Sequence, residues 1–219
     1  MRPGASQLVS ALALVAGLNA VAGTAVAQEP RLRDRLPEPT RIAIDAILDS
    51  AHAEGLSTEP LVDRALEGAS KGAAGERIVA AVQRLWGELR TARISLGPGS
   101  STPEIVAGAS ALRAGADPDD LTRLRELRTR QSLTVASATL ADLVALGVPV
   151  DTAVAAVIAL AEGADDADYL AFRRNVERDI ALGASPVTAL GVRLGPAAGE
   201  ALSNVDQASP QGPRRPRKP

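Results

Sequence analysis

Short amphipathic segments separated by single glycines are the feature that most restricts the fold of this chain. In these segments aliphatic side chains recur three and four residues apart, as Ile44, Ile47 and Leu48 do, which places them on one face of a helix. A glycine then suits the left-handed residue that ends a helix, and Ser, Asp or Pro opens the next one. Strand-like alternation is nearly absent. The sequence therefore predicts an all-α fold over residues 39–202, either a multi-helix bundle or a short irregular stack of helical hairpins.

Several helix boundaries follow from local chemistry. The clearest predicted helix covers residues 75–96, and another covers 133–146. Asp117-Pro118 predicts a sharp helix start, since Pro suits the first helical position and acids suit the first turn. Trp86, the largest side chain of its apolar stripe, is predicted to anchor the core. The Gly-Pro-Gly run at 97–101 is predicted to be a hinge between two halves.

Five joints between predicted helices resemble one another, each with a helix end, a glycine and a capping or Pro-containing start. Their glycines are spaced unevenly along the chain, by 60, 32, 16 and 20 residues. Two interpretations stay open: degenerate helical-hairpin repeats, or the capping chemistry that any short-looped bundle needs. The joints lie at 53–61, 113–121, 145–153, 161–169 and 181–189.

Composition limits both the core and the chemistry. Hydrophobic residues make up 46% of the 219-residue chain, yet there is only one Trp, one Tyr and one Phe. The core is therefore expected to consist of Ala, Val, Leu and Ile, which pack closely but bury little area each. The absence of Cys excludes disulfides, thiol catalysis, Cys-based metal sites and lipid attachment through a Cys at a signal cleavage point.

Residues 1–27 have the three parts of a secretory signal peptide. Arg2 provides the positive end, residues 8–16 are mostly apolar, and the segment ends in Ala25-Val26-Ala27. Cleavage after Ala27 would leave Gln28 as the new N-terminus. The alternative, an uncleaved anchor, is less favoured because the apolar run is short against the ~20 residues of a membrane span. We therefore expect an exported protein, periplasmic or secreted, with no transmembrane segment in the mature chain.

Both ends of the mature chain are predicted to lack packed structure. Residues 28–38 are expected to form a flexible leader, and the polar, Pro-rich residues 203–219 a disordered tail. Because Arg2 carries +1 and the C-terminal end +4, a net charge of −2 leaves −7 for residues 28–213. The tail is a candidate for weak contact with anionic lipid or polymer, or simply a solubilising segment; nucleic acid is not an expected partner. Its cations are Arg214, Arg215, Arg217 and Lys218.

No motif in the sequence indicates a reaction. Asp45, Asp49 and His52 lie on one helix face, but His52 is the sole histidine, so a solvated polar face is preferred to a metal site. Asp165-Asp166-Ala167-Asp168 lacks the ligand pattern of a calcium loop and is interpreted as a helix cap. The Gly-rich turn at 68–75 departs from the P-loop order and is interpreted as an inter-helix turn. We predict no catalytic residue, cofactor or metal.

These observations together favour an exported, non-catalytic helical interaction or scaffold protein of the bacterial cell envelope, with an unknown protein or peptide as its partner. The basic residues are 22 Arg and 2 Lys, a ratio typical of GC-rich bacterial genomes. Two alternatives remain open: an envelope hydrolase that uses carboxylates, and a structural or stress-related envelope protein.

Overall fold

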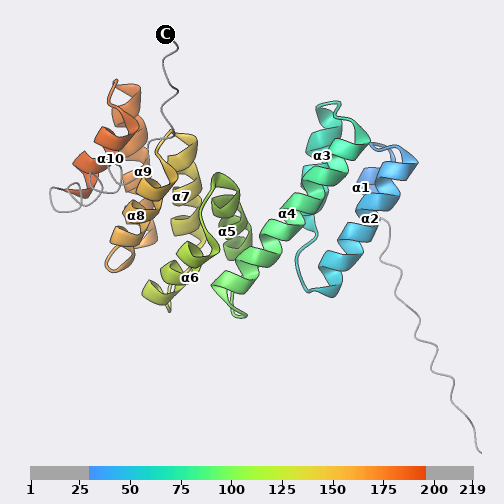
Figure 1. The fold of residues 1–219 in the computed structure, drawn as a ribbon, viewed down its shortest axis with the longest axis horizontal. Helices are drawn as coiled ribbons and strands as arrows, with labels where there is room; N and C mark the ends of the chain where they lie inside the picture. Colours follow the sequence, from blue (N-terminus) through green and yellow to red (C-terminus); the bar gives the residue numbers. More distant parts are fainter. Residues whose placement is uncertain (1–29, 196–219) are drawn as a thin grey trace, which may run out of the picture.

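The structure is a computed structural model that describes residues 30–195. The predicted signal peptide with Ala25, Ala27 and Gln28, and the tail with its four cations, lie outside these residues. Residues 30–195 contain ten α-helices and no strand, which confirms the all-α prediction (Figure 1). None of these helices combines the length and apolarity that crossing a membrane requires. The helices are α1 (Pro30–Arg33), α2 (Glu38–Ala53), α3 (Glu59–Ser70), α4 (Gly75–Leu96), α5 (Thr102–Ala114), α6 (Pro118–Leu127), α7 (Thr134–Ala145), α8 (Val150–Ala161), α9 (Asp166–Ala181) and α10 (Pro186–Leu194).

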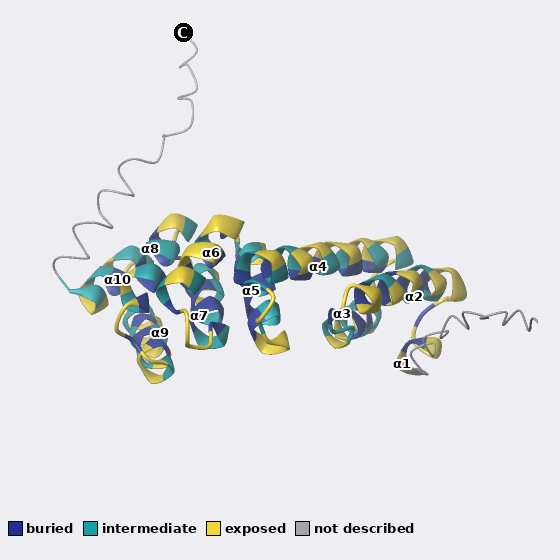
Figure 2. Cartoon of the chain, turned by 90° about the horizontal axis from the view of Figure 1, so that it is seen from below, coloured by how far each residue is buried: buried dark blue, intermediate teal, exposed yellow. Residues whose placement is uncertain are grey.

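The helices lie in two rows, as Figure 2 shows most directly. One row contains α2, α4, α6, α8 and α10, and the other contains α3, α5, α7 and α9. Within the rows, α6 packs between α4 and α8, and α7 packs between α5 and α9. The long α4 contacts α2 and α3 on one side and α5 and α6 on the other, so it joins the N-terminal helices to the rest.

The core between the rows is aliphatic, as the composition predicts. Its fully buried side chains are mostly Leu, Ile, Val and Ala, and the buried aromatic ones are Tyr169 and Phe172. Trp86 packs against this core but is only partly buried, so it lies at the rim and not at the centre that the sequence predicts. Its indole N–H donates to Glu54 Oε2 at 3.2 Å, and the Arg90 guanidinium lies 5.3 Å from its ring centre. The polar edge of the indole thus keeps this side chain at the rim of the core.

The glycine joints explain how short loops turn the chain back on itself. Gly115 has a φ of +112°, its N–H donates to Leu112 O, and the next N–H, of Ala116, donates to Ala111 O. This pair of hydrogen bonds to the last turn of the helix is the Schellman motif. It directs Ala116 into the core. Gly55, Gly147 and Gly183, each with the residue that follows it, form the same pair of hydrogen bonds.

The fifth joint differs from the other four. Gly163 is not among the glycines with positive φ, and Ala164 N–H donates to Leu160 O four residues back. The four similar joints share a local geometry, which capping chemistry alone can produce. The repeat interpretation therefore stays a prediction.

Part of the expected flexible leader is ordered, which corrects the prediction for residues 30–38. Residues 30–33 form α1, which packs on α2 and α3. Leu32 and Leu36 are buried in the core at 0% and 7% exposure. These leucines are four residues apart and share one face of the turn, a signal that the surrounding Pro and charged residues masked.

The segment 97–101 connects two helices that pack directly on each other. Ser100 Oγ donates to Gly97 O at 2.8 Å within the turn. Beyond it, α5 approaches α4 so closely that a methyl group on Gly108 would lie 3.2 Å from Ala92 Cβ and 3.0 Å from Leu96 Cδ1. Hinge motion at 97–101 stays a prediction.

Candidate interaction groove between α6 and α8

The residues considered for metal binding lie on α2 without converging. Asp45 is 3.7 Å from Arg41, and burial raises its pKa although Arg41 opposes the shift. Asp49 and His52 are exposed to solvent. Within residues 30–195, no group of three His, Cys, Asp or Glu side chains has the arrangement of a metal site.

The acidic run before α9 is a helix cap, as interpreted from the sequence. Asp165 Oδ1 accepts the Asp168 N–H at 2.9 Å, and Asp168 Oδ2 accepts the Asp165 N–H at 2.9 Å. This reciprocal pair is a capping box. Within the Gly-rich run at 68–75, residues 71–74 form the turn between α3 and α4, as interpreted, and Lys71 Nζ lies 2.5 Å from Glu67 Oε1.

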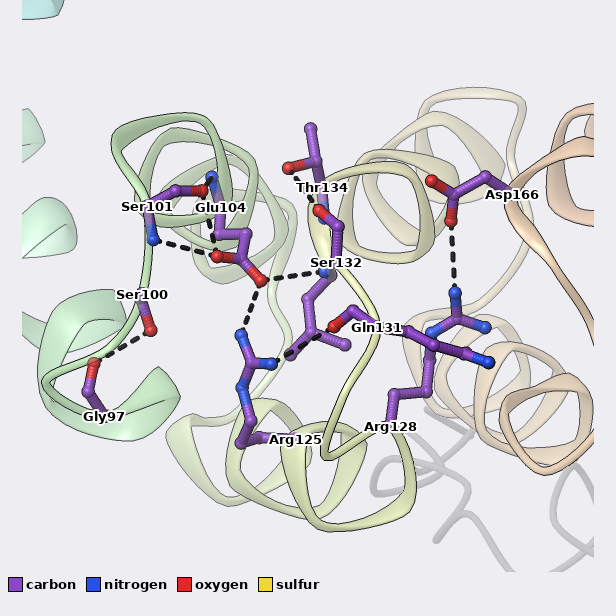
Figure 3. A network of polar contacts seen from close by, with 11 residues as sticks. Gly97, Ser100, Ser101, Glu104, Arg125, Arg128, Gln131, Ser132, Thr134 and Asp166 are labelled. Carbon is purple, nitrogen blue, oxygen red and sulfur yellow. Dashed lines mark hydrogen bonds and ion pairs between the residues drawn. The ribbon is translucent and has the colours of Figure 1, made fainter.

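A buried carboxylate ties three helices together in the C-terminal part (Figure 3). Glu104 on α5 is 7% exposed and accepts hydrogen bonds from Ser101 N–H, Ser101 Oγ, Leu133 N–H and Arg125 Nη2, at 2.5–3.0 Å. Burial by itself would raise the pKa of Glu104, but these bonds favour the charged form and lower it to about 2. The Ser-x-x-Glu spacing at 101–104 signals a capping box that our sequence analysis missed.

A buried arginine makes a second polar link, between α6 and α9. Arg128, 2% exposed, donates to Ala164 O at 2.5 Å and to Asp166 Oδ1 at 3.1 Å, and its guanidinium lies 5.0 Å from the Tyr169 ring centre. The Tyr169 hydroxyl donates to Val157 O at 2.9 Å. These contacts join the C-terminal end of α6 to α9, and α9 to α8, so this cluster holds helices together.

The outward side of the α6–α8 pair forms a groove of about 570 Å³. Its lining combines aliphatic side chains, which we call the floor, with four carboxylates and one guanidinium, which we call the rim and which sum to a formal charge of −3. The floor residues are Leu127, Val154, Ala155, Ile158 and Ala159, and the rim residues are Asp117, Asp120, Arg123, Asp151 and Glu162.

The sequence of α8 explains why this groove has an apolar floor. Ala153, Ala156 and Val157 point into the core and are buried. Val154 and Ile158, on the adjacent face, are only half-buried and line the groove. A helix that is apolar on more than its core-facing side has apolar surface left for a second contact.

The rim acids are available to a ligand. Among the described residues, none of the four carboxylates has an ion-pair partner. Asp117 and Asp120 form the capping box of α6, in which the Asp120 carboxylate accepts the Asp117 N–H at 2.9 Å. Asp117, Asp151 and Glu162 are exposed to solvent. The rim therefore presents a net negative charge without ion pairs beside apolar surface.

Two other cavities are less suited to binding. One of about 840 Å³, between α1 and α3, is lined by charges of both signs, and its Arg31 already lies 2.8 Å from Glu59. A smaller one of about 400 Å³ lies beside Arg128 and Asp166, which bond to each other. The α6–α8 groove thus combines apolar floor and unpaired charge as neither of these does.

Comparison with protein-family models, curated proteins and solved structures finds no match to this chain. The geometry of the groove therefore carries the functional argument. The part of the groove lining that the structure describes contains no Ser, Thr, Cys, His, Lys or Tyr, the side chains that most often act as nucleophiles or bases beside carboxylates. The groove offers electrostatic attraction through its carboxylates and apolar contact through its aliphatic side chains.

Proposed function

We propose that this protein is an exported, non-catalytic interaction protein of the bacterial cell envelope that binds a cationic, partly apolar segment of a partner protein in the α6–α8 groove. The observation that carries the proposal is the unpaired acidic rim above an aliphatic floor. A peptide with Lys or Arg beside apolar side chains would cover the floor and pair with the rim. Exposed acids of this kind mainly speed association and select the sign of the partner.

Photo-cross-linking in living cells tests this binding role. A photoreactive residue at Ala159, in the groove, is expected to form an adduct whose captured peptide carries Lys or Arg among apolar residues. The same residue at Ala80, exposed on α4, serves as the control position. Asp151→Asn with Glu162→Gln should abolish the adduct, whereas Glu126→Gln, an exposed acid of α6 outside the groove, should preserve it. An adduct insensitive to rim neutralisation would disprove this role for the groove.

Export is the second part of the proposal, and it is supported by the signal-like sequence of residues 1–27. We expect protein recovered from the periplasm or the medium to begin at Gln28, since the small side chains of Ala25 and Ala27 suit signal peptidase. Intact-mass measurement reads the N-terminus directly. Recovery of mature-length material solely from the cytosol, or of exported protein that retains Met1, would contradict it.

One observation keeps the hydrolase alternative open: four carboxylates share the rim of one groove. Glycoside hydrolysis needs one carboxyl that stays protonated and acts as the acid. Asp45 and Glu88 do have pKa values raised by burial, but each lies beside an arginine and neither lines the groove. Release of soluble fragments from purified peptidoglycan, lost in Asp151→Asn and Glu162→Gln, would favour this alternative over the binding role.

A further inference from the structure

We propose that the groove between α6 and α8 is occupied, within the same molecule, by the chain's own C-terminal segment, residues 213–219. This inference rests on the proposed binding role and names a ligand for the same groove. The segment carries four cations in seven residues, at Arg214, Arg215, Arg217 and Lys218. The groove rim carries four carboxylates and one arginine. The two charges are opposite and nearly equal in size.

The position at which the described chain ends places the groove within reach. The last described helix, α10, packs on α8, which forms one wall of the groove. Arg214 follows Gly195 by 19 residues. A chain of that length spans up to about 60 Å when extended and about 25 Å as a random coil, whereas a 12-residue helix such as α8 is about 18 Å long. No strain is needed for the segment to lie along α8.

The chemistry of the segment matches the groove in two respects. Arginine guanidinium groups pair with carboxylates through two parallel N–H donors, and Asp151 and Glu162 are exposed at opposite ends of the α8 wall. Pro213, Pro216 and Pro219 provide apolar rings for the aliphatic floor, at positions between the cations. Because proline lowers the conformational entropy of the free chain, less is lost on binding.

Tethering makes such a contact effective even when each ion pair is weak. Exposed pairs contribute little individually and are screened by salt. A segment on the same chain, however, is present at an effective concentration in the millimolar range. The segment would therefore cover the groove at low salt and compete with any cationic partner.

Paramagnetic relaxation tests the contact on the chain with its C-terminus intact. Because the chain has no cysteine, a nitroxide on P216C is the only label. We expect selective broadening of amide signals around Ile158 and Ala159 of α8 and Leu127 of α6, and none around Val62 of α3. The broadening should be lost in Asp151→Asn with Glu162→Gln, retained in Glu126→Gln, and lost in ~0.5 M NaCl, where the Debye length falls to ~4 Å.

Two outcomes would overturn the proposal. Uniform or absent broadening would show that the segment does not occupy the groove. Broadening of an isotope-labelled chain by a separate spin-labelled chain, at the strength seen within one chain, would show that the segment binds a second copy. The binding role is tested independently, because the cross-link from Ala159 to another protein can persist when the relaxation experiment fails. If both proposals hold, neutralising Arg214, Arg215, Arg217 and Lys218 to Ser should increase the yield of that cross-link.

Discussion

The buried carboxylate of Glu104 is expected to make the stability of this protein sensitive to acid. Glu104 is expected to have a pKa of about 2 in the folded state against about 4.5 when unfolded. Its charged form therefore stabilises the fold above pH 4.5, and this contribution is lost as the pH falls towards 2. In Glu104→Gln we expect the free energy of unfolding at pH 7 to be lower by ~2–3 kcal/mol. The free energy of unfolding should also vary less with pH between 4.5 and 2.

Urea unfolding followed by circular dichroism at pH 7, 4.5 and 2.5 measures both effects of Glu104→Gln. Glu126→Gln is the matched control, because Glu126 is exposed and has no ion-pair partner in residues 30–195, so its change should stay within ~0.5 kcal/mol. A variant that kept the wild-type slope with pH would assign the acid sensitivity to other groups.

Arg128 and Arg130 are two residues apart in sequence and differ entirely in surroundings. Arg128→Met removes the bonds to Ala164 O and Asp166 and leaves a buried carbonyl unpaired. We expect a loss of ~2–3 kcal/mol, or a melting temperature lower by ~5–10 °C for a domain of this size. Arg130→Met, at an exposed position, should change the melting temperature little. Equal effects in the two variants would mean that the Arg128 bonds contribute nothing to stability.

Among the helices, the joints differ in what they require of glycine. Gly147 follows α7 with a φ of +90°. Gly163, which follows α8, does not have a positive φ, and a methyl group added there would meet no other atom within 4 Å. Gly147→Ala should therefore lose ~1 kcal/mol or more through backbone strain, and Gly163→Ala should be neutral or slightly stabilising. Chemical denaturation of the two variants side by side measures the contrast, and a loss of stability in Gly163→Ala alone would reverse the assignment.

Across the molecule, the two-row arrangement predicts unfolding that is not fully cooperative. In a stack of this kind, stability is carried mainly by contacts between neighbouring helices. Trp86 reports on α2 and α4, while Arg128 links α6 to α9. In Arg128→Met, the denaturation midpoint by circular dichroism should fall further than the midpoint by Trp86 fluorescence. Coincident shifts by both probes would show a single cooperative unit.

The candidate site was less accessible to sequence reasoning than the helices. The groove residues lie in α6 and α8 or at the caps of these helices. The groove forms only because α6 and α8 pack side by side, although Asp120 and Glu162 are 42 residues apart in sequence. The excess of apolar residues on α8 was the one local signal. For the Glu104–Arg125 and Arg128–Asp166 ion pairs, no local sequence signal indicates which residue pairs with which. Capping patterns reach only three or four residues along the chain, and these partners are farther apart in sequence.

Local chemistry was sufficient for the all-α class and for several boundaries. The predicted helix at 75–96 coincides with α4, and Asp117-Pro118 opens α6, because capping and periodicity act over one or two turns. Packing over long distances decided the rest: the burial of Leu32, the place of Trp86 at the rim, and the pairing of α6 with α8. Those outcomes depend on which apolar faces pack against each other. The apolar stripe of one helix shows that the helix packs against something, but it does not specify which other helix covers it.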